Sequence, residues 1–311
     1  MEATAVAHVA CAAEGDYIPH SAAMLHSVLA HADSSQPCIH YLHGPGLDKQ
    51  ARGLLTGMVE SQGGSIDFLP IQPAAVAGLP ASGYFTSAMW YRIFLPDLLP
   101  HVDRLLYLDV DTIAVDSLAD LWDLDIRDHY LAAVTNVLEP QFAHRPESLG
   151  LPSPDAYFNT GVMLMNLSRM RHDGCTEALR TYAVEHAPGL LWPDQDAFNV
   201  VLGGRRMPLH PRWNCMNSIM HMPESVTVFG TDAVAEAQRN PAIRHFEGPS
   251  INKPWHYLCE RSLRELYFSH RRQTPWPKCR LEGATFTNRG RRLVHALRRR
   301  FPGGFSGAPA R

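Results

Sequence analysis

The most constraining feature of the sequence is an apolar stretch that runs directly into two acidic residues. Leu105 to Leu108 are apolar without interruption, and Asp109 and Asp111 follow at once. Such a run predicts a strand with both faces covered, as in the centre of a parallel sheet. Carboxylates are rarely buried alone, because removing a charge from water costs more than neighbouring apolar contacts return. We therefore expect a positive group at the end of this strand.

Strand-like and helix-like segments alternate along the chain. The strand-like segments are residues 4–13, 38–44, 65–70, 104–111, 131–137 and 161–167, and the helical ones are 19–32, 47–63 and 194–202. This alternation predicts an α/β fold in which helices connect the strands of an open, mostly parallel sheet. Ligands of such sheets bind at the carboxyl ends of the strands, where Asp109 and Asp111 stand.

The two acids suggest a metal site. Alternate residues of a strand face the same side, with Cα atoms about 6 to 7 Å apart, so Asp109 and Asp111 could reach one ion. Mg²⁺ and Mn²⁺ are commonly held by one or two carboxylates together with phosphate oxygens of a substrate. The alternative is a pair of exposed acids that cap a turn, and the two acids alone do not decide between these interpretations.

Four stretches in a fixed order carry more information. They are YLDVDTIAV (107–115), YFNTGVMLMNL (157–167), PDQDAFN (193–199) and HFEGPSINKPWH (245–256). Together they resemble the family 8 retaining glycosyltransferases, which include glycogenin and bacterial lipopolysaccharide galactosyl- and glucosyltransferases. The resemblance spans the chain from its first strand to about residue 258. It implies a Rossmann-like, GT-A type nucleotide-sugar-binding domain over 1–258, and transfer of galactose or glucose from a UDP-sugar with retention.

The resemblance also implies a metal and diphosphate site. Asp109 and Asp111 would hold Mn²⁺ (or Mg²⁺), with His245 as a third ligand. Lys253 would meet the charge that develops on the diphosphate, and Gly248 would let the backbone approach it closely. Lys253 stands five residues after Gly248, whereas the family usually has three.

Three residues resemble the part of the family site that contacts the sugar. Gln195 would stabilise the oxocarbenium-like centre, since an amide is a poor nucleophile. Asp194 would orient the sugar hydroxyls, although its place after Pro193 also suits a helix N-cap. Asn159 would contact the donor sugar, or it could be a turn residue.

The remaining expected contacts surround the nucleotide. Glu14, Asp16 and Tyr17 lie in the first loop, where Tyr17 would stack on uracil. Arg92 matches an arginine near the phosphates and sugar, or it is an ordinary helix ion-pair residue. Val110 lies between the two acids.

Three other functions are compatible with parts of the sequence. Asp109 and Asp111 also match the start of the D-x-D-x-T motif of aspartate-nucleophile phosphatases, but Ile113 replaces the threonine. A glycoside hydrolase would use two carboxylates around a sugar bond. A catalytically inactive nucleotide-sugar-binding protein would keep the fold without the reaction.

Charge is distributed unevenly. Arg271 to Arg311 hold eleven Lys or Arg against one acid, in a chain with 28 basic and 31 acidic residues. We expect a basic extension over 259–311 whose amphipathic helix, with Leu293, Leu297 and Phe301 on one side, binds an anionic membrane surface. A solvated, disordered tail is the alternative. No aromatic stacking platform accompanies the charge, so we expect no nucleic-acid partner.

The cysteines and apolar runs bear on location. Six cysteines are scattered without paired spacing, which is typical of reduced thiols in the cytoplasm. No apolar run approaches the 18 to 20 residues, roughly, that a membrane-spanning helix needs. We therefore expect a cytoplasmic enzyme, peripheral on the inner face of the cell membrane, that acts on a saccharide or glycolipid acceptor in lipopolysaccharide or other surface glycan synthesis.

Overall fold

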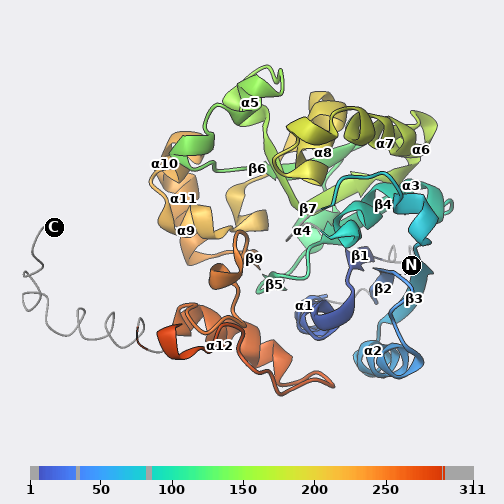
Figure 1. Cartoon of the computed structure of the whole chain (residues 1–311), viewed down its shortest axis with the longest axis vertical. Helices are drawn as coiled ribbons and strands as arrows, with labels where there is room; N and C mark the ends of the chain where they lie inside the picture. The colour runs from blue at the N-terminus through green and yellow to red at the C-terminus, as the bar shows by residue number, and fades with distance from the viewer. Residues whose placement is uncertain (1–6, 33–35, 82–85, 289, 291–311) are drawn as a thin grey trace, which may run out of the picture.

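A seven-stranded sheet forms the centre of the molecule (Figure 1). The computed structural model describes residues 7–32, 36–81, 86–288 and 290. The strands, in their order across the sheet, are β3 (Ser65–Pro70), β2 (Cys38–His43), β1 (His8–Ala12), β4 (Arg104–Leu108), β7 (Phe158–Asn166), β6 (Leu131–Thr135) and β8 (Arg206–Pro208). The predicted strand at residues 4–13 begins in part outside the described residues.

The sheet is mostly parallel, as predicted. The neighbouring pairs β3–β2, β2–β1 and β1–β4 are parallel, and so is β6–β8. Only β7 runs antiparallel to its neighbours β4 and β6 among these strands. A separate two-stranded sheet pairs β5 (Thr112–Ala114) with β9 (Ile243–His245), and it begins immediately after the acids that follow β4.

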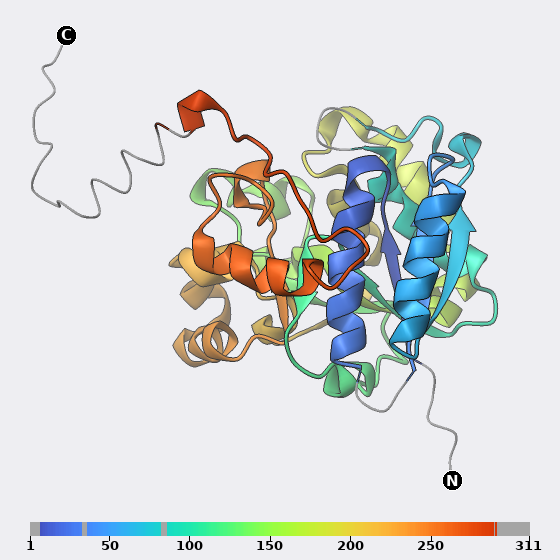
Figure 2. The same ribbon diagram turned by 90° about the horizontal axis from the view of Figure 1, so that it is seen from below.

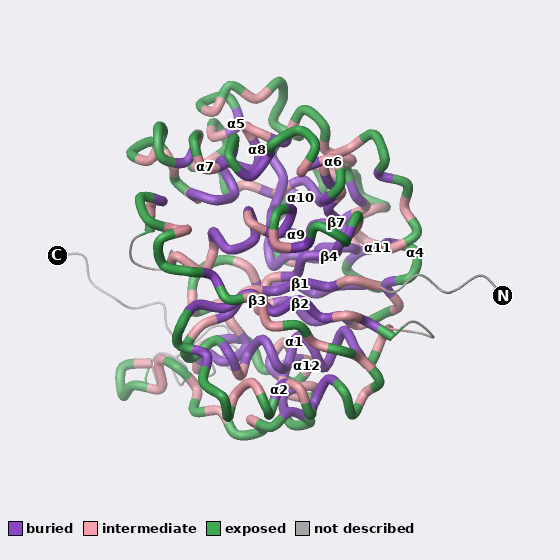
Figure 3. Tube along the Cα trace, turned by 90° about the vertical axis from the view of Figure 1, so that its right-hand side faces the viewer, coloured by how far each residue is buried: buried purple, intermediate pink, exposed green. Residues whose placement is uncertain are grey.

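Helices cover both faces of the sheet, and the buried strands lie between them (Figure 3). One layer contains α1 (Ile18–Ala30) and α2 (Lys49–Ser61), and the other contains α6 (Leu167–His172), α7 (Cys175–Glu185), α8 (Pro193–Leu202) and the 3₁₀ helix η3 (Ser87–Phe94). Alternate side chains of β4 pack against the two helix layers. Leu106 and Leu108 pack against the first layer, and Leu105 and Tyr107 pack against the second. These four side chains are at most 2% exposed, which explains the unbroken apolar run.

The starts of the first two helices follow from their sequences. Pro19 lies in the first turn of α1, where its missing N–H is not needed. Asp48 caps α2, because its side chain accepts a hydrogen bond of 2.7 Å from the Ala51 N–H.

The chain after the last sheet strand returns to α1. Helix α12 (Arg261–Arg271) packs against α1 and runs across its direction (Figure 2), and the Tyr267 hydroxyl is 2.5 Å from His20 Nδ1. Trp255 is fully buried and stacks on the His20 ring at 3.7 Å. Of the predicted basic extension, the membrane-binding helix with Leu293, Leu297 and Phe301 lies outside the described residues.

Shorter elements complete the fold. The remaining α-helices are α3 (Leu95–Leu98), α4 (Ala119–Trp122), α5 (Arg145–Ser148), α9 (Asn217–His221), α10 (Glu224–Phe229) and α11 (Thr231–Arg239). The remaining 3₁₀ helices are η1 (Gly15–Tyr17), η2 (Pro73–Val76), η4 (Pro140–Phe142), η5 (Pro154–Ala156), η6 (Ala187–Gly189), η7 (Gly203–Arg205), η8 (Pro211–Asn214) and η9 (Ser250–Asn252). All six cysteines are unpaired. Within the described residues, every helix is too short or too polar to cross a bilayer.

Candidate active site

The two acids converge because of a turn. The sequence pattern placed Asp109 and Asp111 on a strand, but β4 ends at Leu108 and both acids lie in the tight connection to β5. The Asp109 carbonyl accepts hydrogen bonds from the Thr112 N–H at 3.1 Å and from the Thr112 hydroxyl at 2.7 Å. The turn therefore aims both carboxylates into one space, which corrects the strand-based reason for their convergence.

Strand β9 brings His245 to the acids. It pairs antiparallel with β5, and Thr112 stands opposite His245 in the register. Ligand atoms of Asp109, Asp111 and His245 all lie within 4.8 Å of one another, and His245 Nε2 is 3.3 Å from Asp111 Oδ1. Residues separated by more than a hundred positions thus form one cluster, as predicted.

This cluster suits a divalent cation. Two carboxylates and an imidazole are ligands that Mn²⁺ accepts, and the carboxylates also suit Mg²⁺. Gly161 leaves the space open: a Cβ there would lie 2.3 Å from His245 Cε1 and 3.0 Å from Asp109 Oδ2. The glycine of the YFNTG stretch is therefore required by the close approach of Asp109 and His245.

Lys253 reaches the same cluster. Its ammonium forms an ion pair with Asp111 and donates a hydrogen bond of 2.9 Å to the Phe246 carbonyl. The longer loop between Gly248 and Lys253 turns at Gly248, whose φ of 91° is in the left-handed region that favours glycine. Burial opposes the charge on Asp111, but Lys253 and His245 together hold the pKa of its carboxyl well below the usual range.

Arg92 is buried and forms ion pairs with two acids of the site. It lies in η3, is 5% exposed, and pairs with Asp109 at 2.9 Å and with Asp194 at 3.4 Å. It also donates a hydrogen bond of 2.8 Å to the Thr160 carbonyl. Burial raises the pKa of Asp194 to about 6, although Arg92 opposes that rise. Asp194 lies in the first turn of α8, but its side chain does not cap this helix.

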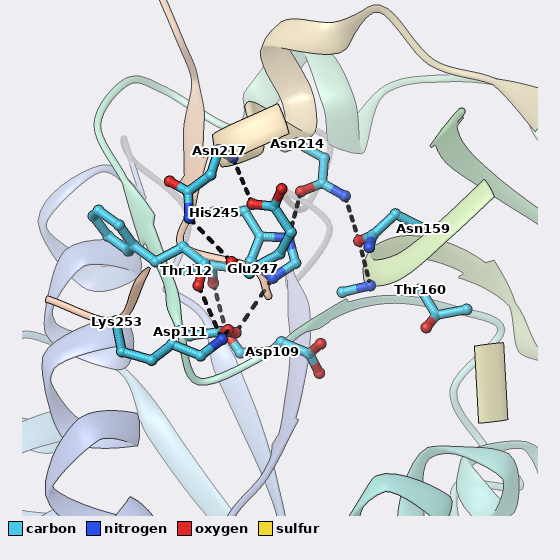
Figure 4. A network of polar contacts seen from close by, with 12 residues as sticks. Asp109, Asp111, Thr112, Asn159, Thr160, Asn214, Asn217, His245, Glu247 and Lys253 are labelled. Atoms are coloured by element: carbon cyan, nitrogen blue, oxygen red, sulfur yellow. Dashed lines mark hydrogen bonds and ion pairs between the residues drawn. The ribbon is translucent and has the colours of Figure 1, made fainter. Parts of the chain in front are cut away.

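A chain of amides leads away from the charged cluster (Figure 4). His245 Nδ1 is 2.8 Å from Asn214 Oδ1, the Asn214 amide donates to Asn159 Oδ1 at 2.8 Å, and the Asn159 amide donates to Gln195 Oε1 at 3.1 Å. Because Asn214 Oδ1 can only accept, His245 carries its proton on Nδ1. Its Nε2 lies 3.3 Å from Asp111 Oδ1, and in the neutral imidazole this nitrogen could ligate a metal.

Gln195 is fixed on its other side as well. Its amide nitrogen donates to the Tyr157 hydroxyl at 3.1 Å, and that hydroxyl donates to Asp196 Oδ1 at 2.7 Å. Asp196 is fully buried and forms an ion pair of 2.5 Å with Arg145. Arg145 is the first residue of α5, so this short helix is joined to the site through Asp196.

The cavity above these residues has a volume of about 1080 Å³. All the predicted site residues line it except Asp16: they are Glu14, Tyr17, Arg92, Asp109, Val110, Asp111, Asn159, Asp194, Gln195, His245, Gly248 and Lys253. Asp16 is exposed in η1 and is not among the residues that line the cavity. Tyr17 is 46% exposed at the cavity, and Glu14 accepts a hydrogen bond from the Tyr91 hydroxyl.

Several residues of the site were not predicted from the sequence. Asn214, which joins His245 to Asn159, follows no recognisable motif. Glu247 lines the cavity and accepts a hydrogen bond of 2.8 Å from the Ser218 N–H. Asp196 and Tyr157 lie inside the matched stretches, so motif position was the signal that could have identified them.

Comparisons with known proteins agree with this geometry. The sequence model named Glycosyl transferase family 8 matches residues 8–259. General stress protein A of Bacillus subtilis (strain 168) is 29% identical over 281 residues, covering 89% of this chain and 96% of that protein. A lipopolysaccharide 1,2-glucosyltransferase of Escherichia coli is 26% identical over 234 residues, covering 74% and 68%. The crystal structure of galactosyltransferase LgtC with donor and acceptor sugar analogues has a TM-score of 0.72 and 25% identity, covering 91% and 99%.

Proposed function

Because the chain belongs to glycosyl transferase family 8, and is thus a glycosyltransferase, we propose that it moves galactose or glucose from a UDP-sugar to a saccharide or glycolipid acceptor, with retention at the anomeric carbon. One observation carries the proposal: Asp109, Asp111, His245 and Lys253 converge at one wall of a cavity whose adjoining wall is a neutral amide network. The catalytic domain over residues 1–258 is part of this proposal.

The charged wall suits the diphosphate. Asp109, Asp111 and His245 would hold Mn²⁺ or Mg²⁺, which supplies Lewis-acid stabilisation of phosphate charge when bound. Lys253 is held by Asp111 and the Phe246 carbonyl at the same cluster, and its ammonium would stand beside the phosphates. Gly248 has no side chain to obstruct the backbone, and Val110 lies between the two acids.

The neutral wall suits the sugar. Transfer forms a bond from the acceptor hydroxyl oxygen to the anomeric carbon and breaks the bond from that carbon to the diphosphate oxygen. UDP leaves with the electron pair, and the acceptor proton passes to a phosphate oxygen or to water. Gln195 Oε1 would present a partial negative charge to the oxocarbenium-like carbon. Asn159 would orient the sugar hydroxyls together with Asp194, which belongs to the adjoining charged wall.

Tyr17 and Glu14 suit the nucleoside. The Tyr17 ring contacts Trp255 only edge-on, with ring centroids 6.1 Å apart, which leaves a face for a base. The Glu14 carboxylate, held by Tyr91, is placed to accept a hydrogen bond from a ribose hydroxyl. Asp16 lies outside the cavity lining and has no part in this proposal.

The acceptor belongs to surface glycan synthesis. The names of relatives such as the lipopolysaccharide 1,2-glucosyltransferase of Escherichia coli and the lipopolysaccharide 1,3-galactosyltransferase of Salmonella typhimurium support a lipopolysaccharide-type acceptor. We place the enzyme in the cytoplasm, at the inner face of the cell membrane, where such acceptors are extended.

The test is release of UDP from a panel of UDP-sugars, with and without Mn²⁺ and with and without saccharide acceptors. We expect release only with Mn²⁺ or Mg²⁺, fastest with UDP-galactose or UDP-glucose. Asp111→Asn should abolish the signal, whereas Asp125→Asn, at an exposed acid paired with Arg127, should not. No release from any donor in the wild-type protein would favour an inactive sugar-nucleotide-binding protein, and phosphate release from simple esters would favour a phosphatase.

The basic C-terminal region is proposed to bind anionic membranes. The charge excess after Arg271 supports this role. Full-length protein should co-sediment with anionic vesicles but not with neutral ones, and truncation before Thr285 should remove that binding. Equal, negligible binding by both forms would contradict it.

A further inference from the structure

A second group of metal-ligand side chains lies at the other end of the sheet from the cavity. His8 begins β1, and Cys38 and His40 stand in the first half of β2. His8 pairs with Cys38 and Ala10 with His40 in the parallel register, so these three side chains share one face of the sheet. Their ligand atoms all lie within 4.8 Å of one another. The cavity-lining Ala12 is four residues further along β1, about 13 Å away.

His40 is the buried member of the group. It is 3% exposed, its Nε2 lies 2.9 Å from His8 Nδ1, and the two rings stack with centroids 5.1 Å apart. Its Nδ1 is buried and has no hydrogen-bond partner within the described residues. A buried polar atom without a partner is uncommon in native proteins and calls for an explanation, of which an ion is one.

Asp67 supplies a carboxylate at the same place. It stands opposite His40 in the register of β2 with β3, and its Oδ2 is 3.7 Å from His40 Nδ1. The same oxygen is 3.8 Å from Cys38 Sγ. The Asp67 side chain is 66% exposed, so solvent and ions can reach the group from this side.

We propose that His8, Cys38 and His40 form a second metal site, for Zn²⁺ or an ion of similar softness, with Asp67 or water as the fourth ligand. Two imidazoles and a thiolate are ligands that tetrahedral Zn²⁺ prefers, whereas Mn²⁺ and Mg²⁺ prefer oxygen. The site is therefore distinct in chemistry from the oxygen-rich cluster at the cavity. It would join β1, β2 and β3 at their amino ends and stabilise the folded chain.

Binding at this site should depend on pH. Burial raises the pKa of the Cys38 thiol. The Cys38 thiol must lose its proton on binding, so affinity should increase with pH.

Cobalt binding to the full-length protein tests the site. Co²⁺ bound through a thiolate absorbs in the near ultraviolet, so the band reports Cys38 coordination and not the carboxylate cluster. We expect one equivalent of Co²⁺ to produce the band in the wild type and in Asp111→Asn. Adding Zn²⁺ should displace the Co²⁺ and remove the band. Cys38→Ser should remove the band. Cys279→Ser is the matched control, since Cys279 is also unpaired and part-exposed, and should retain the band.

Two further measurements keep the test decisive if Cys38→Ser folds poorly by circular dichroism. His8→Gln, at a part-exposed position, should weaken Co²⁺ binding at least tenfold, and Zn²⁺ should raise the melting temperature of the wild type but not of this variant. Absence of the band in the wild type at excess Co²⁺ would overturn the site. Wild-type affinity in His8→Gln, or persistence of the band in a folded Cys38→Ser, would do the same.

Discussion

The two walls of the cavity differ in how they are held together. Ion pairs dominate the charged wall, where Lys253 meets Asp111 and Arg92 meets Asp109 and Asp194. Amides dominate the neutral wall, where Asn214, Asn159 and Gln195 are linked by hydrogen bonds without a formal charge. A buried charge destabilises the folded protein when it lacks an oppositely charged partner. The amide groups, in contrast, can all form their hydrogen bonds in only one arrangement. The charged wall is thus suited to taking up a charged ligand, and the neutral wall to fixing the position of one side chain.

Asp111→Asn should have the largest effect. It removes a ligand of the proposed metal and should lower kcat/KM for UDP-sugar by about 10³-fold or more, the scale of several kcal/mol of charge stabilisation. It also leaves Lys253, only 13% exposed, without its counter-ion, which costs about 3–5 kcal/mol of stability for a buried pair.

A double variant separates these two consequences. Asp111→Asn with Lys253→Met should recover much of the lost stability in thermal unfolding, because no buried charge is left unpaired, yet it should remain inactive. Recovery of activity together with stability would show that Asp111 matters only as a partner of Lys253.

Gln195→Ala should have the next largest effect, on the neutral wall. On the proposed role, the Gln195 carbonyl stabilises the reacting carbon in the transition state, so its removal should lower kcat by about 10²-fold with little change in KM. Gln273→Ala, at an exposed residue in the turn after α12, is the matched control. A rise in KM alone, with kcat unchanged, would assign Gln195 to sugar binding instead.

Gly161→Ala tests the packing of the charged wall, where a new side chain would press on His245 and Asp109. The new Cβ would press on His245 Cε1 and on Asp109, so the variant should need a roughly tenfold higher Mn²⁺ concentration for half-maximal activity. Gly53→Ala in α2, where a Cβ meets nothing within 4 Å, should leave the metal requirement unchanged. An unaltered metal requirement in Gly161→Ala would mean that His245 is not a ligand.

The smallest effect concerns pH. Asp194 has a pKa raised to about 6 by burial, so its carboxyl takes up a proton as the pH falls through that value and its pairing with Arg92 weakens. At saturating Mn²⁺, kcat/KM should therefore fall up to tenfold per pH unit below about pH 6. Asp194→Asn should be slower at pH 7 and should lack this limb. An unchanged acid limb in the variant would assign it to another group.

Much of this arrangement was accessible from sequence, for definite reasons. The apolar run of β4 and the helical spacing of α1 and α2 are local patterns, and both predict the observed elements. The clustering of Asp109, Asp111 and His245 was accessible only through the resemblance to family 8, because nothing local joins positions 111 and 245. Asn214 was missed because its role depends on two distant partners. The prediction that Asp109 and Asp111 converge as alternate residues of a strand was wrong. Both acids lie in a turn, and hydrophobic periodicity does not predict where a strand ends.

The most direct test of the account is a crystal structure of the enzyme with Mn²⁺ and UDP, with the ion located by its anomalous scattering. The account predicts one strong peak bonded to Asp109, Asp111, His245 Nε2 and diphosphate oxygens, with the Lys253 ammonium beside the same phosphates. A peak elsewhere, or these three side chains pointing to separate places around bound UDP, would contradict it.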